Sequence, residues 1–159
     1  MKISKLLVNT LLNEIKTYKE KNPLAIEPFL SSSQYWVYPN YGHRLVIVDP
    51  SDENYVLKYQ LDDYLSCRDN EIEYMICREL FDRRLSARFD IAFACSLRQN
   101  ARVLSMQRAK LFKPNETGIE YPNWMFDKKP ANVGVIDDQV VAIDYGCLQV
   151  AEYLDLHTH

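Results

Sequence analysis

The most informative part of this chain is residues 127–146, which read DKKPANVGVIDDQVVAIDYG. Four polar residues of this stretch attract attention by their type and spacing. Lys129 and Asn132 follow Asp127 by two and five positions, and Asp144 comes twelve positions after Asn132. A carboxylate and an amide supply the oxygen ligands that magnesium prefers. The stretch therefore holds the donor types of a magnesium site.

The apolar residues between these polar groups predict a β-hairpin. Residues 133–135 and 140–143 form two strand-like runs, and the acidic pair at 137–138 stands at the turn between them. Such a hairpin would bring Asn132 and Asp144 to one end. An ordinary hairpin flanked by polar turn residues would carry the same residues, so the hairpin alone leaves both interpretations open.

Length and composition predict one folded domain. The chain has 159 residues, 47% of them hydrophobic, and a formal net charge of −3. This is enough to bury a single core, and it gives no electrostatic attraction to nucleic acid or to anionic membranes. No apolar run approaches a membrane span, and the first residues make a poor signal peptide. The four cysteines are scattered without a C-x-x-C pair, which favours reduced thiols in a cytoplasm.

Apolar periodicity predicts an α+β fold with two amphipathic helices, at 3–20 and 66–81. The first helix is expected to bury one apolar face made of Ile3, Leu6, Leu7, Leu11 and Ile15. Strand-like runs lie at 34–38, 44–49, 55–59, 91–97 and 101–106. Within a single domain, 1–159, we distinguish an N-terminal helix (1–22), a main part (34–109) and a final part (110–159).

The polar spacing resembles the catalytic and metal-binding core of the protein kinase-like superfamily. Asp127 stands where the catalytic-loop aspartate would be, and Lys129 and Asn132 match the lysine and the metal-binding asparagine of the D-x-K-P-x-N run. Residues 144–146, Asp-Tyr-Gly, stand in for the Asp-Phe-Gly metal motif. The His-Arg pair that usually precedes the aspartate is replaced by Met-Phe at 125–126.

This resemblance implies a role for each polar residue. Asp127 would accept or orient the proton of a substrate hydroxyl, and Lys129 would neutralise the transferring phosphoryl group. Asn132 and Asp144 would hold Mg²⁺. The cofactors implied are therefore ATP and Mg²⁺.

The part of the chain before this motif resembles a kinase small lobe, an antiparallel sheet with one helix. Lys58, in the third predicted strand, matches the lysine of the Val-Ala-Ile-Lys motif, which reaches the α- and β-phosphates of ATP. Its carboxylate partner is expected on the following helix. Glu73 lies at the edge of the apolar stripe and is favoured over Glu71. An alternative is that Glu73 completes a capping box with Asn70.

The loop that would cover the nucleotide phosphates and the hinge that would contact the adenine match the kinase pattern less completely. By resemblance, backbone atoms of Gln107 and Ala109 would meet the adenine. The turn at 39–42 has one glycine, where kinases place a glycine-rich phosphate loop, and the serines at 31–33 are a possible substitute. An ordinary hairpin turn is the simpler interpretation of residues 39–42.

Much of a kinase large lobe is missing. Only 17 residues separate Ala109 from Asp127, and 13 follow Gly146, too few for a peptide-binding region. In outline the chain resembles the short kinase-like proteins of tailed bacteriophages, which would place it in the host cytoplasm. The reduced large lobe leaves the phosphoryl acceptor undefined.

Two functions therefore compete. The first, which we favour slightly, is an active ATP- and Mg²⁺-dependent phosphotransferase. The second is an inactive, pseudokinase-like binding module that recognises another protein, for example a host protein that it inhibits or redirects. The third interpretation is a structural α+β domain, in which the acidic residues are ordinary polar residues of turns. The sequence predicts neither a nucleic-acid partner nor a membrane, and it does not define an oligomeric state.

Overall fold

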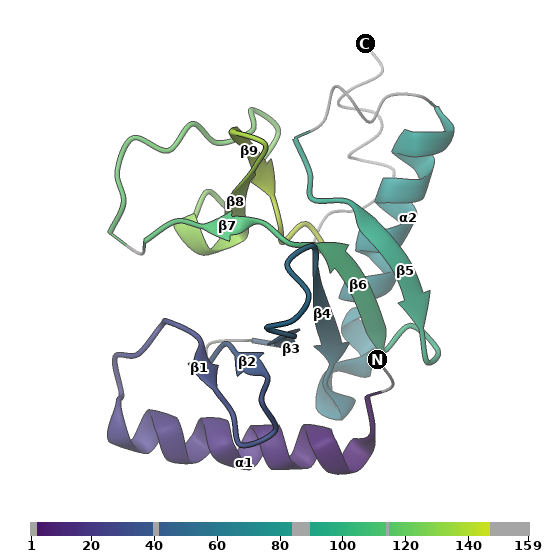
Figure 1. Ribbon diagram of the computed structural model, residues 1–159. Coiled ribbons are helices and arrows are strands. Elements are labelled where there is room, and N and C mark those ends of the chain that lie inside the picture. The colour runs from purple at the N-terminus through teal and green to yellow at the C-terminus, as the bar shows by residue number, and fades with distance from the viewer. Residues whose placement is uncertain (1–2, 40–41, 84–89, 114, 147–159) are drawn as a thin grey trace.

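The computed structural model describes residues 3–39, 42–83, 90–113 and 115–146. Its elements, shown in Figure 1, are in chain order α1 (Lys5–Lys21), β1 (Phe29–Leu30), β2 (Trp36–Val37), β3 (Arg44–Val48), β4 (Tyr55–Gln60), the 3-10 helix η1 (Asp62–Cys67), α2 (Asp69–Asp82), β5 (Ala94–Arg98), β6 (Val103–Gln107), β7 (Lys110–Leu111), the 3-10 helix η3 (Pro130–Asn132), β8 (Val133–Ile136) and β9 (Gln139–Ala142). The predicted α+β class is confirmed.

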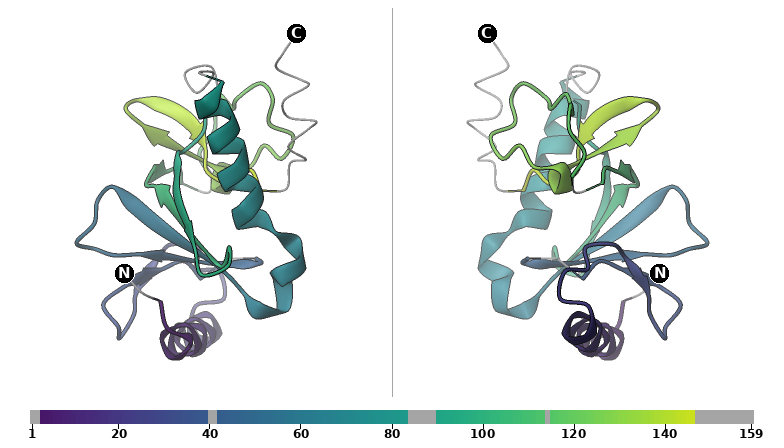
Figure 2. Two further views of the ribbon diagram at one scale, coloured as in Figure 1. Left: turned by 90° about the vertical axis from the view of Figure 1, so that its right-hand side faces the viewer. Right: turned by 90° about the vertical axis from the view of Figure 1, so that its left-hand side faces the viewer.

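An antiparallel sheet of order β1-β2-β3-β4-β6-β5 forms the centre of the molecule, and a smaller sheet of order β7-β8-β9 lies beside it. The two α-helices pack on opposite faces of the large sheet (Figure 2). Alternate residues of β4 show this: Tyr59 belongs to the apolar cluster that contains Leu11 of α1, whereas Lys58 reaches Glu73 of α2.

Helix α1 begins after Ser4, whose hydroxyl accepts a hydrogen bond from the Leu7 amide at 3.2 Å. Its buried face contains Val8, Leu11 and Ile15. Leu6 was expected on this face, but it is 78% exposed. The prediction was wrong because Leu6 lies about 160° around the helix from the buried Val8, on the side away from the sheet.

Helix α2 begins three residues later than predicted, because η1 occupies the preceding turn. Arg68 separates the two helices with a left-handed φ of 52°. The capping-box alternative for the helix start is wrong. Glu73 turns inward and accepts hydrogen bonds from Lys58 and from the backbone after β9, while the Asn70 amide donates to the carbonyl of Lys58.

The hairpin of β8 and β9 forms as predicted, with Val133 opposite Ala142 and Ile136 opposite Gln139. Its two-residue turn, 137–138, has positive φ angles of 49° and 63°, which suit a tight hairpin. Strands β1 and β7 were not predicted because two residues show no periodicity. The expected turn at 39–42 includes residues 40 and 41, which lie outside the described residues, as do Cys147 and the rest of 147–159.

Candidate functional site

Four charged side chains from distant parts of the chain meet between α2 and the large sheet. Lys58 Nζ lies 3.0 and 2.9 Å from the two carboxylate oxygens of Glu73. Arg44 contacts both acids: its Nη1 is 2.9 Å from Glu73 Oε2, and its Nη2 is 2.5 Å from Asp144 Oδ1. We call Arg44, Lys58, Glu73 and Asp144 the charged quartet. Its two positive and two negative charges balance.

Strand pairing places the two cations of the quartet side by side. In the β3–β4 ladder, Lys58 stands opposite Val46 and Arg44 stands opposite Gln60. Residues two positions apart on a strand point to the same face, so both cations face α2. Arg44 and Lys58 are almost fully buried, at 6% and 5% exposure.

The structure chooses between the two candidate partners of Lys58. Glu73 is completely buried at the inner side of α2 and pairs with Lys58, as the helical position predicted. Glu71 lies toward solvent and pairs instead with Arg68 at 2.6 Å. The predicted Lys58–Glu73 contact is therefore confirmed, whereas its role in binding nucleotide stays a prediction.

Glu73 is the centre of the quartet. Its Oε1 also accepts hydrogen bonds from the backbone amides of Tyr145, at 3.1 Å, and Gly146, at 3.2 Å. Burial alone would raise the pKa of Glu73, but Arg44 and Lys58 outweigh burial and lower it to about 2. Burial and the neighbouring charge of Arg44 lower the pKa of Lys58 below its usual value, against the opposing effect of Glu73.

The Asp-Tyr-Gly residues dock directly onto α2 and onto the segment that precedes β5. The hydroxyl of Tyr145, a residue that is 1% exposed, donates to the carbonyl of Ala92 at 2.8 Å and lies 3.1 Å from the thiol of Cys77. Gly146 packs on the first turn of α2, where a Cβ atom would stand 2.7 Å from the Asp69 carbonyl oxygen. This approach requires glycine because any side chain would overlap the helix backbone.

A second polar group lies on the loop before β8. Lys129 Nζ is 2.9 Å from Asp127 Oδ1, and the Asn132 side-chain amide donates to Asp127 Oδ2 at 3.0 Å. The hydrogen bond from Lys129 lowers the pKa of Asp127. The Asp127 side chain is about half exposed, at 49%, so its carboxylate can be reached from solvent.

The backbone of Ile143 joins the two polar groups. Its amide donates to the carbonyl of Asn132 at 2.9 Å, and its carbonyl accepts a hydrogen bond from Lys58 Nζ. The hairpin thus brings Asn132 and Asp144 to one end, as predicted.

The donors at this end of the hairpin fit Mg²⁺ as a partial set. Asn132 and Asp144 offer amide and carboxylate oxygens, and the Asp144 side chain is 48% exposed. Among the described residues, no group of three or more His, Cys, Asp and Glu side chains could hold a metal. Magnesium commonly completes its shell with water and phosphate oxygens, so these two protein ligands would leave the rest of the shell to water and phosphate.

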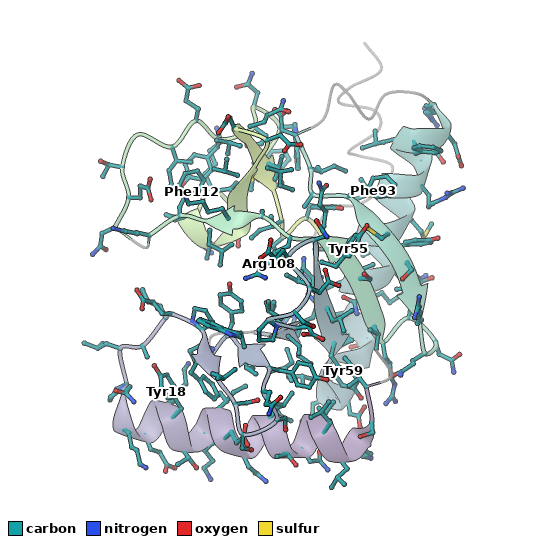
Figure 3. The ribbon with its side chains drawn as sticks, viewed as in Figure 1. Tyr18, Tyr55, Tyr59, Phe93, Arg108 and Phe112 are labelled. Atoms are coloured by element: carbon teal, nitrogen blue, oxygen red, sulfur yellow. The ribbon has the colours of Figure 1, made fainter. Side chains whose placement is uncertain are left out.

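The predicted hinge residues lie elsewhere, on a cleft of about 1050 Å³ that is lined by residues of the small sheet and of β2, β4, β5 and β6. In Figure 3 the Arg108 side chain projects toward this space. The residues that line the cleft include Trp36, Tyr38, Tyr55, Arg108, Phe112 and Ile136. Gln107 and Ala109 also line it, but no quartet member does. The backbone amide of Gln107 is already engaged, because it donates to the carbonyl of Phe93, the residue before β5, at 2.8 Å.

Arg44 is the site residue that the sequence reasoning missed. It opens the apolar run of β3, and no local pattern marks it as different from a solvated strand cation. Its partners lie 29 and 100 positions further along the chain, so only the packing of α2 and the hairpin onto the sheet reveals its contacts.

Within the described ranges, neither α-helix has the length and apolar character needed to cross a membrane. Comparisons with protein-family models, with curated proteins and with solved structures found no match to this chain.

Proposed function

We propose that the chain is a minimal kinase-like phosphotransferase that binds ATP and Mg²⁺. The observation that carries the proposal is the buried Lys58–Glu73 ion pair, held next to Asp144 and linked through Ile143 to Asn132. Phosphoryl transfer in kinases depends on a strand lysine paired with a helix glutamate and on a metal-binding aspartate. The same three residue types meet here from a strand, a helix and a hairpin end.

Each residue has a definite task in this proposal. Glu73 holds the ammonium of Lys58, which contacts the phosphates of the nucleotide. Asn132 and Asp144 hold Mg²⁺, which when bound supplies positive charge to the phosphate oxygens. Asp127 orients the acceptor hydroxyl, and Lys129, 2.9 Å from it, neutralises charge on the transferred group.

The hinge cleft would hold the base. Gln107 and Ala109 line it, and its aromatic residues offer flat apolar surface to a planar ring. The quartet is separate from the lining of this cleft, so the phosphates would extend from the cleft toward Lys58 and Asp144. Because Lys58 is only 5% exposed, nucleotide binding would require the residues around its ammonium to move and expose it.

Thermal unfolding with and without Mg-ATP tests the proposal. Ligand at about 100 times its Kd should stabilise the protein by roughly 2.7 kcal/mol. Lys58→Met should remove this stabilisation, whereas Lys16→Met, at an exposed position of α1, should keep it. Equal stabilisation of the wild type and Lys58→Met, or none in the wild type, would contradict the proposed nucleotide site.

A pseudokinase-like binding module is the second candidate, and one contact favours it. Asp144 is already paired with Arg44, so the metal-binding carboxylate is engaged within the protein. This candidate predicts no phosphate transfer and no stabilisation by Mg-ATP, together with a partner protein recovered by affinity capture. Transfer of labelled phosphate that disappears in Asp127→Asn would exclude it.

A further inference from the structure

Arg44 pairs with the carboxylate of Asp144, which the proposed metal site would use as a ligand. Its Nη2 lies 2.5 Å from Asp144 Oδ1, one of the two oxygens that this carboxylate could offer to a metal. A guanidinium and a divalent cation carry charge of the same sign, so they compete for one carboxylate. The carboxylate can satisfy both only if each takes a different oxygen, and their mutual repulsion opposes even that arrangement.

The surroundings of Arg44 allow it to leave Asp144 without becoming unpaired. Its Nη1 keeps Glu73 Oε2 at 2.9 Å and the side-chain oxygen of Asn70 at 3.4 Å. These contacts hold the guanidinium on the α2 side, where it is 7% exposed. Asp144, in contrast, is about half exposed and ends a hairpin, so it can turn toward solvent.

We infer that Arg44 acts as an internal cation that competes with Mg²⁺ for Asp144 and so sets the metal concentration at which the site becomes loaded. The inference rests on the proposed function, because it takes Asp144 as a metal ligand. Without metal, Arg44 neutralises Asp144 and holds the hairpin end against the sheet. When the metal binds, the Arg44–Asp144 contact breaks while the Arg44–Glu73 contact remains. Arg44 is a positioning residue in this scheme, since it acts through Asp144.

Metal titration of the whole chain without nucleotide tests this competition. The probe is Mn²⁺, followed by its electron paramagnetic resonance signal, with Mg²⁺ added to displace it. Arg44→Gln removes the competing charge and should lower the Kd for the metal by about tenfold or more. This factor corresponds to the free energy of one charge-assisted hydrogen bond. Arg44→Lys keeps the charge and should gain much less affinity. Arg83→Gln removes an exposed arginine paired with Glu79 and should change nothing.

A double variant locates the effect. Asp144→Asn in the Arg44→Gln background should abolish the gained affinity. Unchanged or weaker metal binding in Arg44→Gln, or a gain that survives Asp144→Asn, would overturn the inference while leaving nucleotide binding by the wild type intact. Absence of metal binding in every variant would overturn the inference and the proposed metal site together.

The unmutated chain offers a second measurement if Arg44→Gln does not fold. The Nε–H nuclear magnetic resonance signal of Arg44, assigned with Arg44→Lys, should shift when Mg²⁺ is added. The signal of Arg83 should stay in place. An Arg44 signal that does not respond to saturating metal would also overturn the inference.

Discussion

The guanidinium of Arg44 lies 2.5 Å from the carboxylate of Asp144, a residue that comes 100 positions later in the chain. This contact ties the segment that follows β9 of the small sheet to the first residue of β3 in the large one. Lys58 and Glu73 complete a neutral group in which every charge has an opposite charge within hydrogen-bond distance. A buried charge that loses its partner destabilises a protein strongly, so each member matters for folding as well as for chemistry.

Glu73→Gln should lower the free energy of unfolding by about 3 to 5 kcal/mol, because it leaves Lys58 and Arg44 as buried cations without their shared carboxylate. Urea unfolding at neutral pH measures the change. Glu71→Gln is the matched control on the same helix. Its exposed contact with Arg68 contributes less than about 1 kcal/mol. Similar losses in the two variants would show that the quartet does not stabilise the fold.

Stability should fall in acid as Glu73 becomes protonated. Its pKa is lowered from 4.5 to about 2 in the folded protein, so its contribution is fully present above about pH 4.5 and is lost as the pH falls toward 2. Glu73→Gln lacks this group, so the stability difference between wild type and variant should shrink over this range. Unfolding free energies at pH 6, 4 and 3 measure it. A constant difference would mean that the carboxylate of Glu73 has an ordinary pKa.

Gly146→Ala should lower stability by about 1 to 3 kcal/mol, the usual effect of overpacking. The new Cβ would stand 2.7 Å from the carbonyl oxygen of Asp69 and 2.9 Å from its Cα, so the Asp-Tyr-Gly segment would have to move off α2. Thermal unfolding measures the loss. Gly118→Asn is the comparison: Gly118 has a left-handed φ of 79°, which strains asparagine less than other side chains, and a Cβ there meets nothing within 4 Å, so its loss of stability should be the smaller one.

Asp127→Asn should abolish phosphate transfer while nucleotide binding persists. Asp127 lies on the exposed loop, and the described hydrogen bonds and ion pair of its carboxylate go to Lys129 and Asn132, so its replacement should leave the quartet intact. Loss of an acid–base group reduces rates by about 10² to 10⁴-fold. Labelled ATP with candidate acceptors measures transfer, and thermal unfolding with Mg-ATP measures binding. Asp138→Asn, in the hairpin turn, should transfer normally; equal activity in both variants would remove Asp127 from the mechanism.

Elements whose residues interact locally were predictable from the sequence. The hairpin of β8 and β9 follows from two strand-like runs around a short acidic turn, and both helices follow from their apolar spacing. The choice of Glu73 over Glu71 followed from the same helical geometry. The two-residue strands β1 and β7 escaped prediction because they exist only through pairing with β2 and β8.

The sequence by itself determined the α+β class, the hairpin that brings Asn132 and Asp144 together, and the inward position of Glu73, since these depend on periodicity and neighbouring residues. Only the tertiary structure decided that Arg44 pairs with Asp144 and that the Asp-Tyr-Gly segment docks on α2. Those contacts join residues more than 70 positions apart, and they form because buried charges and backbone amides must find partners wherever packing brings them.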